Sequence, residues 1–152
     1  MSNRFFAVCG AVFIDNKVML VRHTYGKAKD RILLPGGYVK EGELPTDAIA
    51  REIFEETSVR ACADSVICIQ FKGDQWCVVF RMNYIEGTPV SDNHENSEVL
   101  LLPVEEAVKR PDLTNMSRAI LNSIISDKGN KLEKGSYNSI TLAPGSFEIF
   151  GI

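Results

Sequence analysis

The segment GYVKEGE at residues 37–43, followed by REIFEE at residues 51–56, says more about this chain than any other stretch. The clearest helix of the sequence, over residues 45–57, follows the first part and includes the second. It begins with a proline, which suits a first helical position. At about 100° per residue, its apolar side chains lie on one face. The carboxylates of Glu52 and Glu56 share another face. The segment therefore predicts a helix that packs on one side and carries acidic groups on another.

Three carboxylates, those of Glu52, Glu55 and Glu56, gather on this helix beside the glycine pair at residues 36–37. Like charges at i and i+4 destabilise a helix unless positive charge lies between them. Two interpretations follow from the carboxylates alone. One is a solvated acidic face. The other is a site for a hard cation, Mg²⁺ or Mn²⁺, which takes oxygen ligands from carboxylates, water and phosphate, with the backbone carbonyl of Gly36 as a further candidate.

The whole pattern favours the cation site, because it resembles the Nudix box. That box reads Gly, five residues, Glu, seven residues, then Arg-Glu-apolar-any-Glu-Glu-any-Gly-apolar. Eight positions agree: Gly37, Glu43, Arg51, Glu52, Ile53, Glu55, Glu56 and Val59. Only Ser58 departs, where the family has a glycine that ends the helix in a left-handed conformation. The chain therefore resembles the Nudix hydrolases, which include MutT.

The resemblance implies an α/β fold: an α/β/α sandwich around a mixed sheet, with the box as a loop-helix-loop. We expect one domain over residues 1–152, with the box at residues 37–59 and a C-terminal tail from about residue 128. Sequence patterns predict strands at residues 4–14, 17–21, 32–34, 65–72, 75–84 and 98–104. They also predict a helical turn at residues 104–109 and a helix at residues 114–126. The two box glycines should end any regular element, and residues 73–74 should form a hairpin turn.

The last apolar stretch, residues 147–150, has two possible places. It either covers the edge of its own sheet or swaps onto a neighbouring copy, which leaves monomer and homodimer both open. Three aromatic residues, Phe6, Tyr25 and Trp76, are candidates for stacking on a base, but single aromatics in strands favour the core. The four cysteines, Cys9, Cys62, Cys68 and Cys77, lie in apolar stretches without metal-ligand spacing, so we expect buried, reduced thiols.

Further site residues follow from the resemblance. The metal ligands implied are Glu52, Glu55, Glu56 and the Gly36 carbonyl, while Glu43 and Arg51 pair to fix the helix on its loop. The general base is either Glu52 or a glutamate from the loop before residue 99, where Glu95 and Glu98 are candidates. We favour Glu95, because Glu98 adjoins the apolar run of residues 99–102. Arg22 lies where the family often contacts substrate phosphate.

Composition limits the function classes. The chain has 152 residues, 45% hydrophobic and 24% charged, which is ordinary for one globular domain. Its net charge of −3 lacks the basic surface that long nucleic acids require, although a bound cation would suit a small anionic ligand. The N-terminus has too few apolar residues for a signal peptide, and no apolar run reaches the ~20 residues that span a bilayer. We therefore expect a cytoplasmic protein without membrane partners.

The expected function is metal-dependent hydrolysis of a phosphoanhydride bond in a nucleoside diphosphate linked to another group. Residues 59–76 hold neither the proline nor the tyrosine that some nucleotide-sugar and dinucleotide hydrolases carry, so nucleoside triphosphates, including oxidised ones, are favoured. Three alternatives stay open: nucleotide sugars or dinucleotides as substrates, a module that senses a nucleotide without cleaving it, and hydrolysis at RNA ends.

Overall fold

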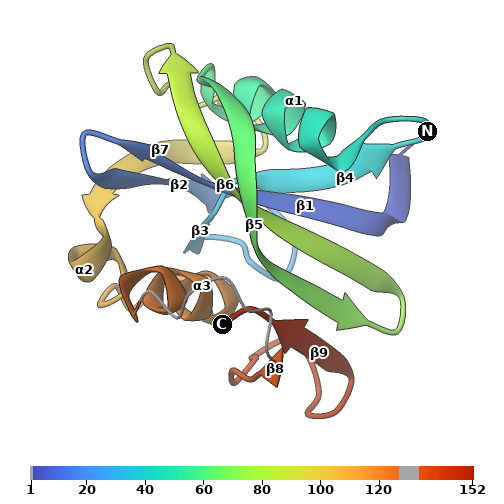
Figure 1. The fold of residues 1–152 in the computed structure, drawn as a ribbon. Coiled ribbons are helices and arrows are strands. Elements are labelled where there is room, and N and C mark those ends of the chain that lie inside the picture. Colours follow the sequence, from blue (N-terminus) through green and yellow to red (C-terminus); the bar gives the residue numbers. More distant parts are fainter. Residues whose placement is uncertain (1, 127–133) are drawn as a thin grey trace.

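The computed structural model describes residues 2–126 and 134–152 and shows a strongly twisted mixed sheet with helices on both sides (Figure 1). Its strands are β1 Ser2–Ile14, β2 Lys17–His23, β3 Ile32–Leu33, β4 Gly36–Lys40, β5 Arg60–Lys72, β6 Gln75–Glu86, β7 Asn96–Pro103, β8 Lys134–Gly135 and β9 Phe147–Phe150. Its helices are α1 Pro45–Thr57, α2 Val104–Ala107 and α3 Asn115–Ser126.

The sheet follows the order β3-β2-β1-β6-β5-β9-β8, with β4 also pairing β1 and β7 also pairing β2. Strands β1 and β6 run parallel, and the other pairings are antiparallel. Helix α1 covers one side of the sheet, whereas α2 and α3 cover the other (Figure 1). The expected α/β/α sandwich with a mixed sheet is therefore confirmed.

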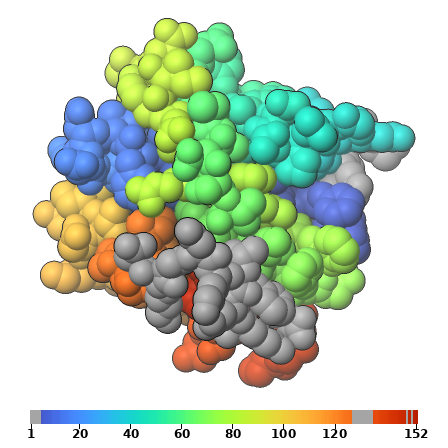
Figure 2. Space-filling view, viewed as in Figure 1, coloured from blue at the N-terminus to red at the C-terminus, as the bar shows by residue number. Residues whose placement is uncertain are grey.

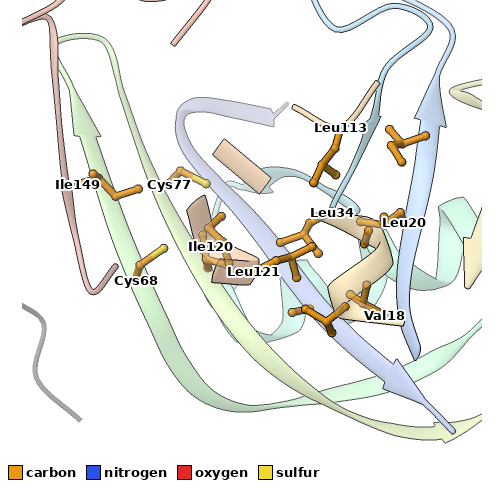
Figure 3. Close-up of a cluster of buried hydrophobic side chains, with 14 residues drawn as sticks. Val18, Leu20, Leu34, Cys68, Cys77, Leu113, Ile120, Leu121 and Ile149 are labelled. Carbon is orange, nitrogen blue, oxygen red and sulfur yellow. The ribbon is translucent and has the colours of Figure 1, made fainter. Parts of the chain in front are cut away.

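Two apolar clusters fill the spaces between these layers, and strand alternation divides the residues between them. Along β2, Val18 and Leu20 face α2 and α3, whereas Met19 faces α1. Figure 3 shows the cluster on the α3 side, where Leu20 and Leu34 lie with Leu113 and Leu121. This alternation decides which side of the sheet each polar residue at a strand end can reach.

The helix at residues 45–57 and the hairpin turn at residues 73–74 are confirmed. The expectation that the box glycines end regular structure is wrong, since both belong to β4 and pair with Val8 and Cys9 of β1. Here glycine permits close strand contact: a Cβ on Gly36 would lie 2.1 Å from the Val8 carbonyl oxygen. The glycine pair is therefore a packing requirement within a strand.

Several boundaries also differ from the predictions. Strand β5 begins at Arg60 rather than residue 65, because it pairs with β6 along its length through three register shifts. Strand β7 begins at Asn96 rather than residue 98, and β8 was not expected. Helix α2 ends at Ala107 rather than residue 109. The differences in the strands come from strand pairing and not from local sequence preference.

The C-terminal strand β9 covers the edge of its own sheet. It pairs antiparallel with β5, from Lys72 opposite Phe147 to Ile69 opposite Phe150. Ile149 is buried in the apolar cluster on the α3 side, as Figure 3 shows. In the space-filling view the C-terminal strands and α1 lie at opposite ends of the molecule (Figure 2). The first part of the predicted tail, residues 127–133, lies outside the described residues.

The cysteines of the described chain are free, and Cys68 and Cys77 are buried as expected. Cys62 is exposed, so that part of the prediction is wrong. Trp76 and Phe6 are also not core residues: they are 42% and 38% exposed, because they pack on each other and on Phe5 rather than into either cluster. Within the described residues, no helix is long and apolar enough to cross a membrane.

Candidate metal centre and its surroundings

Helix α1 carries the site, and its two ends are stabilised differently. Its first turn has no side-chain cap at Leu44, so the proline at the first position and Asp47 support it instead. At its end, Ser58 adopts the left-handed conformation (φ 62°) and donates its N–H to the Phe54 carbonyl at 2.9 Å. The serine thus takes the backbone geometry expected of the family's glycine. The helix therefore still ends at Thr57.

Arg51 ties the helix to the loop before it. Its Nε and Nη2 donate to both carboxylate oxygens of Glu43 at 2.7 and 2.9 Å, and Nη2 also donates to the Tyr38 carbonyl at 3.1 Å. The Arg51 guanidinium lowers the pKa of Glu43 to about 2. The expected Glu43–Arg51 pair is present. Arg51 Nη1 also donates to Glu52 Oε1 at 2.8 Å, so the same guanidinium orients an acidic residue of the site.

The Glu52 carboxylate packs directly on Gly37 of β4. A Cβ at position 37 would lie 2.3 Å from Glu52 Cδ, so any other residue would displace the carboxylate. Burial raises the pKa of Glu52, and the bond from Arg51 opposes this shift. The first glycine of the motif therefore makes room for the first glutamate of the helix.

Glu56 lies one helical turn after Glu52 and is only 3% exposed. Among the described residues its Oε2 has no hydrogen-bond partner. Burial, together with the charges of Glu52 and Glu95, raises the pKa of Glu56 to about 9. A buried carboxylate without a donor is costly unless it is neutralised by a proton or a cation. Glu56 is therefore the residue that most needs a positive charge.

Glu95 comes to the site from the loop before β7. The Asp92 Oδ1 atom accepts N–H groups of residues 94, 95 and 96 at 3.0 to 3.1 Å, which fixes the loop from within. Directly after β2, the Thr24 hydroxyl and N–H both donate to the Glu95 carbonyl, at 3.1 and 3.2 Å. Asn96 then joins the loop to α1, since its Nδ2 donates to the Glu56 carbonyl at 2.8 Å.

Carboxylate oxygens of Glu52, Glu56 and Glu95 lie within 4.8 Å of one another. We call these three residues the acidic cluster. Oxygen ligands at this separation suit Mg²⁺ or Mn²⁺, and the unpartnered Glu56 oxygen gives such an ion a place. The residues present therefore fit a divalent cation. Glu52 and Glu56 of the box and Glu95 of the loop thus lie together, and their roles as metal ligands and base stay predictions.

Other predicted residues lie elsewhere. Glu55 is 52% exposed, and its carboxylate accepts from Arg51 Nη1 at 3.2 Å, so it lies outside the acidic cluster. Arg22 donates to Glu98 at 2.9 Å and to Asp112 at 3.0 Å. These contacts engage both Arg22 and Glu98 in one ion-pair group. Gly36 lies in β4, and its carbonyl as a metal ligand stays a prediction, as do the roles of Glu55 and Arg22.

Three residues that support the site were not singled out from the sequence: Asp92, Thr24 and Asn96. Asp92 alone had a local signal, because an aspartate two to four residues before other loop residues often accepts their N–H groups. Thr24 and Asn96 act across long sequence separations, so their role needed the fold. Tyr25, next to Thr24, stacks on His23 at 5.2 Å, and its pKa is raised by burial and by the charges of Glu95 and Glu56.

The fold and the site together define an α/β/α protein with a carboxylate cluster suited to a divalent cation. The chain matches the NUDIX domain family over residues 4–123, and it belongs to that family. Solved structures share the fold: a NUDIX hydrolase from Nitrosomonas europaea has a TM-score of 0.74 at 20% identity, covering 84% of this chain and 73% of that one.

Curated relatives are similar over shorter stretches. An RNA pyrophosphohydrolase of Bartonella bacilliformis is 36% identical over 76 residues, which are 50% of this chain and 42% of that protein. An ADP-ribose pyrophosphatase of Methanocaldococcus jannaschii is 35% identical over 69 residues, which are 45% of this chain and 41% of that protein. The chain thus spans less than half of the length of either relative.

Proposed function

We propose that this protein hydrolyses a phosphoanhydride bond in a nucleoside diphosphate linked to another group, with Mg²⁺ or Mn²⁺ as cofactor. The observation that carries the proposal is the acidic cluster, in which Glu56 is buried, unpartnered and faced by two further carboxylates. A cation-dependent reaction at phosphate explains it.

The metal would be held by Glu52 and Glu56, with Glu55 and the Gly36 carbonyl as further ligands, while Glu95 would face it from the loop before β7. When bound, such an ion neutralises phosphate oxygens and lowers the pKa of water. The protein's own contribution is to fix the carboxylates. Gly37 leaves room for Glu52, Arg51 orients it, and the Asp92 loop holds Glu95.

We assign Glu95 as the residue that takes the proton from the attacking water. Glu52 is the alternative, but Arg51 already holds one of its oxygens at 2.8 Å, which leaves its carboxylate less free to meet an attacking water. Glu98 is engaged by Arg22, which supports the choice of Glu95 within this loop. A base on a loop, facing metal ligands on a helix, divides the two tasks between two elements.

The relatives support this reaction class. Both are named for cleaving pyrophosphate bonds in nucleotide-linked substrates, one in RNA and one in ADP-ribose. For this chain we propose a small nucleotide substrate, because a net charge of −3 does not suit a long polyanion. Nucleoside triphosphates, ADP-ribose, nucleotide sugars and dinucleotides all belong to this class.

The test is a panel assay with nucleoside triphosphates, oxidised dGTP, ADP-ribose, nucleotide sugars, dinucleotides and a short 5′-triphosphorylated RNA. Each is incubated with Mg²⁺, Mn²⁺ or chelator, and phosphate-containing products are measured. Metal-dependent release of a nucleoside monophosphate or pyrophosphate is expected with at least one small substrate. Tight nucleotide binding without any cleavage would overturn the proposal in favour of a sensing module. Cleavage of the RNA alone would overturn the choice of a small substrate.

A further inference from the structure

A cavity of about 250 Å³ opens on the α3 side of the sheet, apart from the acidic cluster. Its walls come from five segments: the loop after β2, β3, the adjoining ends of β5 and β6, the start of α3, and the stretch between β8 and β9. Lys27, Arg31 and Lys72 contribute to its lining, and none of its lining residues is acidic. In a chain of net charge −3 this is a concentration of positive charge.

The outer wall of this basic cavity is residues 136–146, which we call the C-terminal loop. Five of its residues line the cavity: Tyr137, Ser139, Ile140, Thr141 and Leu142. The loop lies beyond residues 4–123, where the chain matches its family, so this wall is additional to the matched domain. In Figure 1 the C-terminal loop lies below the sheet, between β8 and β9.

Side-chain contacts hold the C-terminal loop against the body of the protein. The Tyr137 hydroxyl donates to Gln70 Oε1 on β5, and Asn115 Nδ2 donates to the Asn138 carbonyl. Burial raises the pKa of Tyr137 to about 12, so the hydroxyl stays a donor at ordinary pH. Within the loop, the Ser139 hydroxyl accepts N–H groups at residues 141 and 142. The loop is therefore built as a fixed wall.

The loop after β2 links this cavity to the acidic cluster. At one end Thr24 holds the Glu95 carbonyl, and Tyr25 lies within the field of Glu95 and Glu56. A few residues later Lys27 and Arg31 line the basic cavity. One short segment thus borders both places.

We propose that the basic cavity is a second binding site, which takes a phosphate-bearing group of the ligand, and that the C-terminal loop selects what enters it. Arg and Lys side chains together with the first N–H groups of a helix are the partners that phosphate uses in proteins. Helix α3 supplies such an N-terminus at residues 115 and 116 of the lining. Lys72 has a carboxylate neighbour, Asp74 at 3.4 Å, but Asp74 is 85% exposed and competes weakly.

This proposal rests on the proposed function in one respect only: it assumes that one ligand occupies both the acidic cluster and the basic cavity. The first measurement is therefore independent of activity: inorganic phosphate is titrated into the chelator-treated protein and followed by amide chemical shifts. Saturable shifts are expected at residues 27–31, 114–116 and 137–142. Shifts confined to the acidic cluster, or none that saturate, would overturn the site.

A matched pair of variants tests the wall. Ile140 lines the cavity and is 64% exposed, whereas Ala143 lies in the same loop, is exposed and does not line it. Ile140→Asp should weaken phosphate binding at least tenfold, while Ala143→Asp, which adds the same charge nearby, should change it less than twofold. Lys27→Ala and Lys29→Ala form a second pair, because only Lys27 lines the cavity. Equal effects within both pairs would contradict the assignment.

The second measurement uses NADP⁺ and NAD⁺ in chelator, since these dinucleotides differ by one phosphate monoester. Tighter binding of NADP⁺, at least tenfold, is expected for the wild type, and Ile140→Asp should abolish the difference. Equal affinities in the wild type would overturn the preference for an additional phosphate. If no substrate is hydrolysed but these binding differences persist, the proposed function fails while the second site stands.

Discussion

The acidic cluster and the basic cavity differ in how the chain builds them. The acidic cluster takes two of its carboxylates from one turn of α1, and only the third, from the loop before β7, has to be brought in by long-range contacts. The basic cavity takes its lining from five segments, including a C-terminal loop beyond the matched domain. The two proposed roles therefore differ in origin. The acidic cluster, proposed for the chemistry, is encoded mostly in one helix, whereas the basic cavity, proposed for recognition, depends on five separate segments.

The largest expected effect is on the acidic cluster. Glu56→Gln should lower metal-dependent hydrolysis on the order of 10³-fold or more, because the metal loses its most buried ligand. Phosphate binding at the basic cavity, measured in chelator, should not change. Steady-state rates and the phosphate titration check both statements. Loss of cavity binding in this variant would mean that the two centres are not independent.

A smaller loss is expected at the loop glutamate. Glu95→Gln should reduce turnover on the order of 10²-fold, as loss of a general base does, and flatten the acid limb of the pH–rate profile. Glu98→Gln is the matched control, because Glu98 lies in the neighbouring β7 and pairs with Arg22 instead. It should stay within about threefold of the wild type, since exposed ion pairs contribute little. A flattened profile in Glu52→Gln with a normal one in Glu95→Gln would transfer the base to Glu52.

The sequence predicted much of the acidic cluster because its information is local. Spacing along α1 places Glu52 and Glu56 together whatever surrounds the helix, and the Arg51–Glu43 pair spans only eight residues. The same local logic misled at residues 36–37, where glycine indicated a break but packing against Val8 required a strand. Local patterns identify a helix face reliably, whereas they do not show which strand lies beside a glycine.

The basic cavity could not be predicted for the same reason. Lys27 and Lys72 are 45 positions apart, and no spacing rule connects them. Lys27 and Arg31 are near one another in the sequence, but the cavity also needs the end of β5 and the C-terminal loop to close it. Exposed aromatics such as Trp76 show a related limit, since alternation gives the face of a residue and not whether another layer covers it.

The pH dependence of stability offers a third test of the contrast between the acidic cluster and the basic cavity. In the metal-free protein the pKa of Glu56 is raised to about 9, above the value of about 4.3 for an unfolded glutamate. Between these values the folded state binds more protons, so the free energy of unfolding falls as pH rises, by at most about 1.4 kcal/mol per pH unit. Glu56→Gln should remove this slope.

Urea unfolding of the wild type and of Glu56→Gln, in chelator at pH 6 and pH 8, measures this change of the free energy of unfolding with pH. The difference between wild type and variant isolates Glu56, because other titrating groups are common to both. Mg²⁺ should restore the free energy of unfolding of the wild type at pH 8 and have little effect on that of the variant. A wild type that becomes more stable relative to the variant at pH 8 in chelator would contradict the burial cost assigned to Glu56.

The smallest effect concerns the end of α1. Ser58 has a positive φ of 62°, which costs a serine about 1–2 kcal/mol, and its side chain is exposed. Ser58→Gly should stabilise the protein by about 0.5–1 kcal/mol, because glycine removes that strain but loses more entropy on folding. Asn93, with φ 55° in the loop that carries Glu95, is the matched control, since asparagine tolerates this conformation. Asn93→Gly should therefore raise the thermal unfolding temperature by less.

Turnover of the Ser58→Gly variant tests the same position in another way. If turnover is unchanged, the acidic cluster depends on its own carboxylates and not on how the helix ends. A change in turnover would show that the single departure from the box pattern tunes the metal centre two residues before it.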